Sequence, residues 1–291
     1  MSPAPPPAPD EHRLPADHHE LPAGLAARHW RPSPLLRASA ALHGGALLLT
    51  ALRPHWWPWT LGAVIANQLQ LTALGLWPRS SALGSNWTRL PAAAAARGEI
   101  AITIDDGPDP EVTPRVLAIL AEHRVRATFF CIGERALRHA ACVRDCVQAG
   151  HEIGNHSYRH AHNFSLLGPT RLRREVAHAQ QVLSQVSGTP PRFFRAPAGL
   201  RNPLLDPVLQ RQGLQLTSWT RRGFDTVSSD AASVLARLSR NLRAGDILLL
   251  HDGHAARGHS GTPVVLEVLP RLIEAITQRA LRPVTLREAL Q

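Results

Sequence analysis

Short apolar runs and longer stretches with helical periodicity alternate along the chain from Glu99 onward. A run that is short, rich in β-branched residues and ended by turn residues predicts a buried strand. A stretch whose apolar positions recur every three or four residues predicts a helix that buries one face. By these rules strands are predicted at 100–104, 126–132, 192–195, 214–219, 246–250 and 283–285, and helices at 112–123, 134–149, 169–186, 203–212, 231–243 and 262–279.

This alternation predicts an α/β domain over residues 99–291, built on a parallel sheet or barrel. The domain is short for an eightfold barrel, which takes about 250 residues. In such folds the side chains that follow the carboxyl ends of the strands point into the crevice where the chemistry takes place. Functional residues are therefore expected directly after the predicted strands.

The residues before 99 do not alternate in this way. Residues 1–34 are rich in Pro, Ala and His and cannot bury enough apolar area to fold, which predicts a disordered tail. No apolar stretch follows a basic start within them, so they do not have the pattern of a secretory signal. Residues 78–98 contain Pro, Ser and Gly and an alanine run, and they are predicted to form a linker.

Two apolar stretches, 35–52 and 59–77, lie between this tail and the linker. Each has about the length that spans a bilayer core, and tryptophans at positions 56, 57, 59 and 77 stand where an aromatic belt would lie. Residues 35–77 are therefore predicted to form a transmembrane hairpin of two helices. The polar residues Asn67, Gln68 and Gln70 weigh against this, and the alternative is a pair of core helices packed on the downstream domain.

Composition narrows the classes of function. The 291 residues carry a formal net charge of +10, and every basic side chain other than histidine is an arginine. The arginines are scattered, and only one Tyr and six Phe are available for base stacking, so no nucleic-acid partner is expected. Cys131, Cys142 and Cys146 form no C-x-x-C motif and are expected to be small buried residues.

Two adjacent carboxylates, Asp105 and Asp106, follow the first predicted strand directly. Such a pair is stable only beside a positive group. His156 and His160 are four residues apart, which on a helical turn puts both imidazoles on one face, as in sites that bind a divalent metal. With Asp106 they would leave one position open for the water of a hydrolytic reaction. The alternative is an ordinary acidic turn and a chance pair of histidines.

Other predicted strands also end in side chains that can carry charge. Arg195 leaves a strand and is placed to pair with Asp105, the alternative being a surface arginine before a turn. His251 ends a buried strand and is a candidate general acid. Trp219 and Asp225 follow another strand.

In these segments the chain resembles the polysaccharide deacetylase family, which is the NodB-homology domain of carbohydrate esterase family 4. The resemblance covers roughly residues 99–290 and implies a distorted (β/α) barrel with fewer than eight strands. The segments that carry it are Thr103-Ile-Asp-Asp-Gly-Pro108, His156-Ser-Tyr-Arg-His160, Arg195-Ala-Pro-Ala-Gly199, Asp225 after Trp219, and Leu249-Leu-His251.

The resemblance also implies a role for each site residue. Asp105 would be the general base and His251 the general acid. Arg195 would orient Asp105, and Asp225 would in turn tune Arg195. A divalent metal ion, zinc or alternatively cobalt, nickel or manganese, would be held by Asp106, His156 and His160.

The resemblance implies a substrate pocket walled by Pro197, Ala198, Gly199 and Trp219. Ala198 replaces the aromatic residue that the family usually has there. The smaller side chain leaves the pocket more open, so the resemblance does not establish that this chain acts on the family's usual substrate. The backbone N–H of Ala198 remains to stabilise an oxyanion.

The predicted function is that of a metal-dependent hydrolase that removes acetyl groups from N-acetylated sugars of a polysaccharide or glycan. The alternatives are an O-deacetylase, an amidase on a non-sugar substrate, and a catalytically silent carbohydrate-binding membrane protein. The predicted location is the bacterial cell membrane. Arginines at both outer ends of the hairpin would keep both ends cytoplasmic, whereas an enzyme of the cell wall faces outward, so the side of the membrane stays open.

Overall fold

The computed structural model describes residues 30–258 and 260–291. The predicted disordered tail lies outside the described residues except for its last five. Within them, seven strands form a continuous parallel sheet in the order β5-β4-β3-β2-β1-β7-β6, and β8 pairs with the start of β1. The strands are β1 Glu99–Asp105, β2 Thr128–Cys131, β3 Glu152–Asn155, β4 Phe193–Phe194, β5 Gln215–Leu216, β6 Arg221–Arg222, β7 Ile247–His251 and β8 Arg282–Pro283.

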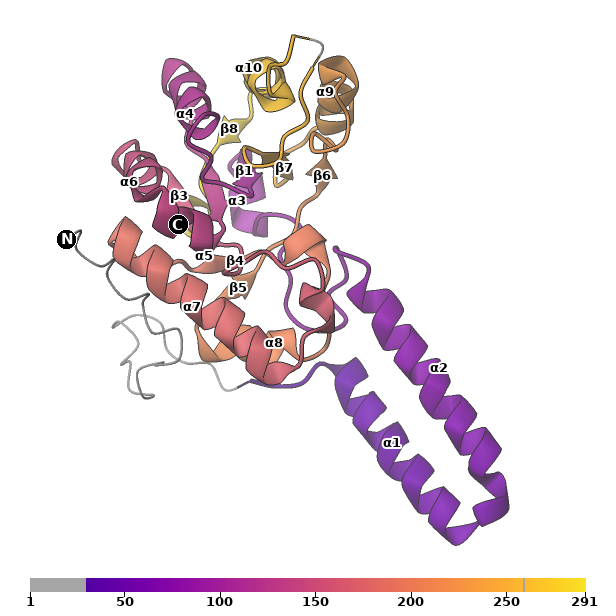
Figure 1. The fold of residues 1–291 in the computed structure, drawn as a ribbon. Coiled ribbons are helices and arrows are strands. Elements are labelled where there is room, and N and C mark those ends of the chain that lie inside the picture. Colours follow the sequence, from indigo (N-terminus) through magenta and orange to yellow (C-terminus); the bar gives the residue numbers. More distant parts are fainter. Residues whose placement is uncertain (1–29, 259) are drawn as a thin grey trace, which may run out of the picture.

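The sheet is curled into a half-barrel, and Figure 1 shows helices around the outside of the curl. This confirms the predicted parallel α/β fold. The seven-strand path agrees with fewer than eight strands, and the two-residue β8 brings the described total to eight. The helices of this domain are α3 Ala92–Ala96, α4 Thr113–Glu122, α5 Gly133–Arg138, α6 Ala140–Gln148, α7 Pro169–Ser187, α8 Leu205–Arg211, α9 Ala231–Ser239 and α10 Val264–Thr277.

The central strands β1 and β7 are buried along their whole length. Apolar side chains from α4, α9 and α10 pack against them and form the largest core cluster. Strands covered on both faces read as continuous apolar runs, which is why these two were visible in the sequence. Their register places Asp105 beside His251, so the core that fixes the two strands also fixes these two side chains.

Four elements differ from the sequence-based predictions. Strands β3 and β6 were not predicted, because one has four residues with a glycine inside and the other has only two. The helix predicted at 134–149 is broken at His139, whose φ and ψ of −121° and 47° are not helical. The alanine run in the predicted linker forms α3, and Ala94 in it is fully buried.

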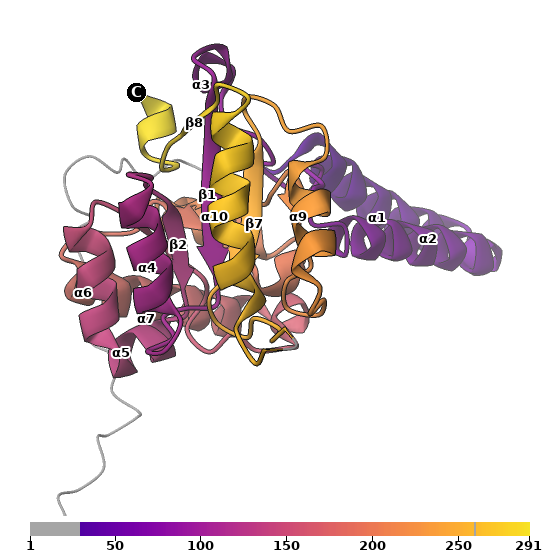
Figure 2. The same ribbon diagram turned by 90° about the horizontal axis from the view of Figure 1, so that it is seen from above.

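The N-terminal helices α1 Pro34–Leu52 and α2 Trp57–Gly75 form a hairpin joined by a short 3-10 turn at Pro54–Trp56. Figures 1 and 2 show this hairpin extending away from the half-barrel. Of the described helices, only α1 is long and apolar enough to count as a candidate membrane span. The prediction of two such helices is thus wrong for α2 by this criterion, because its polar residues lower its average hydropathy.

The polar side chains of the hairpin lie between its two helices. Asn67 donates a hydrogen bond to the Ser39 hydroxyl at 2.8 Å, and the hydroxyls of Thr50 and Thr60 are 2.7 Å apart. A third pair, between His43 Nε2 and Gln68 Nε2 at 3.0 Å, lies nearer the surface of the hairpin. Large apolar residues point outward instead and are 47–75% exposed: Leu47, Leu48, Leu52, Leu61, Ile65 and Leu69.

Candidate active site

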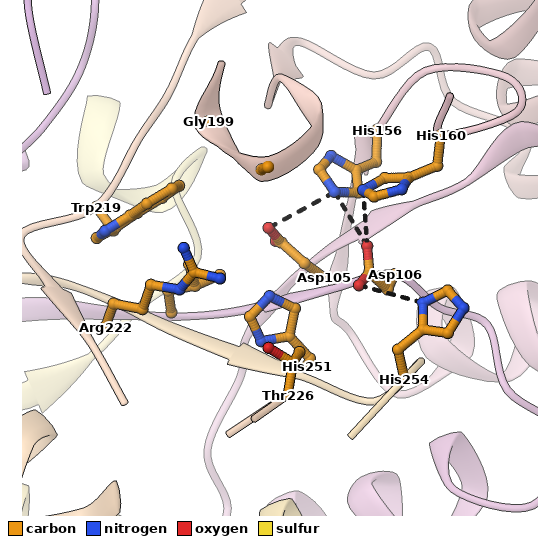
Figure 3. A pocket seen from close by; sticks show the side chains of 12 residues that line it. Asp105, Asp106, His156, His160, Gly199, Trp219, Arg222, Thr226, His251 and His254 are labelled. Atoms are coloured by element: carbon orange, nitrogen blue, oxygen red, sulfur yellow. Dashed lines mark ion pairs between the residues drawn. The ribbon is translucent and has the colours of Figure 1, made fainter. Parts of the chain in front are cut away.

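The ends of several strands meet in one pocket (Figure 3). Asp105 ends β1 and His251 ends β7, His156 follows β3, and Arg195 follows β4. The candidate side chains that the sequence places after the strands therefore lie close together at one edge of the sheet. The pocket is lined by Asp105, Asp106, His156, His160, Ala198, Gly199, Trp219, Arg222, Thr226, Leu249, His251 and His254.

Asp105 and Asp106 enter this pocket from adjacent positions. Side chains of successive residues in an extended strand point to opposite faces, but Asp106 has a φ of 71° and therefore leaves the strand geometry. This left-handed conformation is costly for a non-glycine residue and is a common form of strain at functional sites. The two carboxylates are 3% and 6% exposed, so both need partners inside the protein.

Asp106 lies at the centre of a cluster with two histidines. Its Oδ1 is 3.2 Å from His156 Nε2 and 3.2 Å from His160 Nε2. The Nδ1–H of His156 donates to the backbone carbonyl of Arg195 at 2.8 Å, which leaves Nε2 to face Asp106. Burial by itself raises the pKa of Asp106, but its close contacts with His156 and His254 and the charges of His156 and His251 outweigh burial and hold this pKa well below its usual range.

This cluster fits a divalent cation. Among the described atoms, the buried Asp106 Oδ1 has no hydrogen-bond partner. Ligand atoms of Asp106, His156 and His160 all lie within 4.8 Å of one another. Two imidazole nitrogens and one carboxylate oxygen are a common ligand set of catalytic zinc. The cluster therefore has the donors, the spacing and the unsatisfied oxygen that a bound cation would complete.

The two histidines do not lie on a helical turn, and that expectation is wrong. The segment after β3 is irregular, and both Ser157 and His160 have positive φ, at 62° and 53°. These conformations exclude a helix and fold the loop so that the two imidazole centroids are 4.8 Å apart. The four-residue spacing found the right pair, although for a different geometric reason.

Arg195 pairs with Asp105 as predicted. Its Nη1 donates to Asp105 Oδ1 at 2.7 Å and to the Thr103 hydroxyl at 2.8 Å. The remaining guanidinium hydrogen bonds go to backbone carbonyls, and the group lies 4.1 Å from the Phe130 ring centroid. Arg195 is only 1% exposed. A buried, fully bonded ion pair of this kind fixes the orientation of the Asp105 carboxylate.

Asp225 binds His251 rather than Arg195. One carboxylate oxygen accepts from His251 Nδ1–H at 2.9 Å, and the other accepts from the His251 backbone N–H at 2.7 Å. This corrects the expectation that Asp225 would act on Arg195, whose donors are already used by other groups. Burial lowers the pKa of His251, but the hydrogen bond and charge of Asp225 outweigh it, so this pKa lies above its usual value.

The predicted substrate-binding residues divide into two sets. Ala198, Gly199 and Trp219 line the pocket, whereas Pro197 is buried and is not among the lining residues. Ala198 has a φ of 53°. Gly199 has no room for a side chain, because a Cβ there would lie 2.6 Å from the Trp219 ring and 2.7 Å from Pro78.

Sequence reasoning missed three lining residues, Arg222, Thr226 and His254. Arg222 belongs to β6, which is too short to be seen in the pattern. His254 lies 3.5 Å through Nδ1 from Asp106 Oδ2, and Arg135 holds its Nε2 at 2.7 Å. Its place three residues after His251 was a signal that could have found it.

A family model for polysaccharide deacetylases matches residues 93–217. A peptidoglycan-N-acetylglucosamine deacetylase from Bacillus cereus is 32% identical over 194 residues, which cover 66% of this chain and 88% of the relative. The chain belongs to the polysaccharide deacetylase family. A second family member, the chitooligosaccharide deacetylase of Azorhizobium caulinodans, is 37% identical over 158 residues, which cover 54% of this chain and 75% of that one.

A solved structure of this family agrees with the half-barrel. The family 4 acetyl xylan esterase from Clostridium thermocellum, in complex with a cobalt ion, superposes with a TM-score of 0.59 at 33% sequence identity. The match covers 66% of this chain and 89% of the esterase. The hairpin α1–α2 lies outside the residues matched by the family model.

Proposed function

We propose that this family member is a metal-dependent hydrolase that removes acetyl groups from N-acetylated sugars of a glycan. The observation that carries the proposal is that two proton-transfer groups, Asp105 and His251, lie beside an Asp/His/His cluster, and that each is held by its own buried partner. A protein that only bound carbohydrate would need neither of these buried, separately held groups. The names of the two relatives, which act on peptidoglycan and on chitooligosaccharide, support a glycan substrate.

Asp105 acts as the general base in this proposal. Arg195 holds its Oδ1 at 2.7 Å, whereas its Oδ2 faces the cluster at 3.8 Å from His156 Nε2. The free oxygen is thus placed to accept a proton from water that attacks the acetyl carbonyl. Arg195 fixes the direction in which that oxygen points.

His251 acts as the general acid. Its Nδ1–H is bonded to Asp225, so its Nε2 is left for the substrate. The raised pKa increases the share of protonated imidazole at any given pH, and the protonated imidazole is the form that can protonate a leaving amine. The backbone N–H of Ala198 is proposed to stabilise the oxyanion.

A divalent cation bound at Asp106, His156 and His160 would polarise the acetyl carbonyl and acidify the attacking water. We propose zinc, with cobalt, nickel and manganese as the alternatives. The cobalt ion in the related esterase supports a divalent metal without choosing among them. Elemental analysis of protein purified without added metal tests both the stoichiometry and the identity, and we expect one ion per chain.

Acetate release from glycans of defined structure tests the reaction. We expect an N-acetylated chitooligosaccharide or peptidoglycan to yield one free amine for each acetate. Acetate from acetylated xylan without a new amine would favour the O-deacetylase alternative, and release from an acetylated non-sugar amine alone would favour an amidase. Glycan binding without acetate release from metal-loaded protein would favour the catalytically silent alternative.

We further propose that the hairpin of α1 and α2 inserts into the membrane as a unit, in which α1 covers the polar residues that keep α2 from being a candidate span by itself. Each helix has 19 residues, which at about 1.5 Å per residue matches a hydrocarbon core of about 30 Å. The polar side chains contact each other between the helices, where transmembrane helices hold their polar groups. Three of four exposed tryptophans lie at the tip and the fourth at the base: Trp56, Trp57, Trp59 and Trp77.

Flotation of the full chain with phospholipid vesicles tests this anchor. We expect the whole chain to float and a chain without residues 1–76 to remain in the dense fractions with its metal bound. The cut is made there because Leu90 and Ala94 belong to the core of the half-barrel, so a chain that began near Arg97 would lose core residues. A full chain that stays soluble without detergent would contradict the membrane proposal. Reporter fusions at the C-terminus would identify the side of the membrane.

A further inference from the structure

The pocket has one arginine in its lining, and neither of the two acidic lining residues contacts it. Of the residues that line it, only Asp105 and Asp106 are acidic. Both are already engaged, one by Arg195 and the other by the histidine cluster. Arg222 adds a guanidinium to the same pocket, so a neutral sugar would leave this charge uncompensated.

Arg222 differs from its neighbour Arg221 on the same strand. Arg221 points away from the pocket, donates to Asp246 Oδ2 at 2.6 Å and bonds the carbonyls of Arg240 and Asn241. Across the described residues, the Arg222 side chain makes no hydrogen bond or ion pair, and its Nε is buried without a partner. Leaving a buried donor unsatisfied is costly, so this group is expected to have a partner that the chain itself does not supply.

The Arg222 guanidinium is held in position by aromatic rings. It lies 5.0 Å from the ring centroid of Phe224 and 5.6 Å from that of Trp219. Figure 3 shows it between Trp219 and His251, pointing into the pocket. Cation–π contacts of this kind favour a fixed orientation without neutralising the charge. The arginine is therefore prepared to bind before a substrate arrives.

We propose that Arg222 binds an anionic group, a carboxylate or a phosphate, on the glycan that is deacetylated. A planar guanidinium can donate two parallel hydrogen bonds to either group, which a lysine cannot reproduce. This inference rests on the proposed deacetylase function and narrows it to acidic glycans. Arg222 is then a specificity-determining residue that contacts the substrate.

The test compares three N-acetylated oligosaccharides of equal length: a neutral one, one with a carboxylate on an adjacent sugar, and one with a phosphate. We expect the native chain to have a kcat/KM at least about tenfold higher on one charged substrate than on the neutral one, the usual scale of a charged hydrogen bond. The charged substrate with the higher value identifies the anion. The advantage should shrink as ionic strength rises.

Substitution then assigns the preference to this residue. Arg222→Gln should raise KM for the preferred charged substrate by roughly tenfold to a hundredfold, and its loss on the neutral substrate should be threefold or less. Arg222→Lys should restore part of the loss. Arg211→Gln, which removes the same charge at an exposed position on α8, is the matched control and should keep the preference.

Equal losses on charged and neutral substrates, or a native preference for the neutral one, would overturn the proposal. Calorimetric binding of the same glycans separates it from the proposed function. If the native chain releases no acetate at all but binds the charged glycan more tightly through Arg222, the deacetylase proposal fails and the anion site stands. If acetate is released at the same rate from charged and neutral glycans, the anion site fails and the deacetylase proposal stands.

Discussion

The half-barrel and the hairpin distribute their polar groups in opposite ways. In the half-barrel the apolar side chains form the interior, and the buried charged groups of the site satisfy one another, as Arg195 does with Asp105 and His251 with Asp225. In the hairpin the polar groups meet between the helices, and the large apolar side chains face outward.

This difference is what the proposed membrane anchor predicts, because the two regions would then have different surroundings. Water favours burial of apolar area, which explains the half-barrel. A bilayer offers no such gain for outward-facing leucines and instead penalises polar groups that have no partner, so the proposed membrane insertion would account for the hairpin. Exposed apolar side chains and partnered polar side chains are therefore expected to contribute differently to stability in the two regions. Substitutions can test that contrast.

The largest effect is expected where the half-barrel buries charge. Arg195→Ala would leave the Asp105 carboxylate buried without its partner, which costs about 3–5 kcal/mol of unfolding free energy. Thermal and denaturant unfolding measure this loss. Turnover should fall further than metal content in the protein that remains folded, because the Arg195 side chain contacts Asp105, and the Arg195 carbonyl that holds His156 is kept in the alanine variant. Parallel loss of metal and activity would assign Arg195 to the cluster or to folding.

The next largest effect is expected when an exposed leucine of the hairpin is replaced by arginine, and the matched control is an exposed leucine of the half-barrel. Leu48 is 61% exposed on the hairpin and Leu166 is 83% exposed on the half-barrel. Arginine costs about 2.5–3.5 kcal/mol at the centre of a membrane helix and less toward its ends, and Leu48 lies five residues from the middle of α1. Leu48→Arg should therefore weaken flotation with vesicles, whereas Leu166→Arg should have no effect. The contrast fails if both variants float like the native chain.

A smaller effect is expected at the second buried pair. Asp225→Asn removes the charge that raises the pKa of His251, so this pKa should fall. The general acid must be protonated, and its protonated fraction is lost as pH rises through the pKa. The alkaline limb of the kcat/KM profile should therefore move to lower pH, by about one unit for the loss of a close charge. An unchanged alkaline limb would remove His251 from the acid role.

Long patterns in the sequence predicted the fold better than short ones did. β1 and β7 are continuous apolar runs and were found, whereas the two-residue β6 carries no periodicity and was missed, and Arg222 with it. His139 interrupts a helix for which the apolar pattern runs on unbroken. Such breaks depend on local packing that a single sequence does not display.

Contacts between loops were the least predictable part of the site. The pairing of Arg195 with Asp105 followed from the order of strand ends, but the choice of Asp225 between Arg195 and His251 depends on which loop lies beside β7. In the sequence, Asn67 weighs against a membrane hairpin as a polar residue in an apolar stretch. Its hydrogen-bond partner, Ser39, lies on the other helix and cannot be recognised from the sequence. A polar residue in an apolar stretch can be judged only with its partner in view.

The central claim is that the two adjacent carboxylates have separate roles. Asp105 accepts a proton, and Asp106 binds the metal. Metal content by elemental analysis, measured beside acetate release for each purified variant, tests it most directly, with the exposed Asp145→Asn as control. We predict that Asp106→Ala loses both metal and activity. Asp105→Asn should keep its metal near the native level and lose catalysis by roughly 100-fold or more. Loss of metal in Asp105→Asn with retention in Asp106→Ala, or acetate release unchanged in both, would contradict the account.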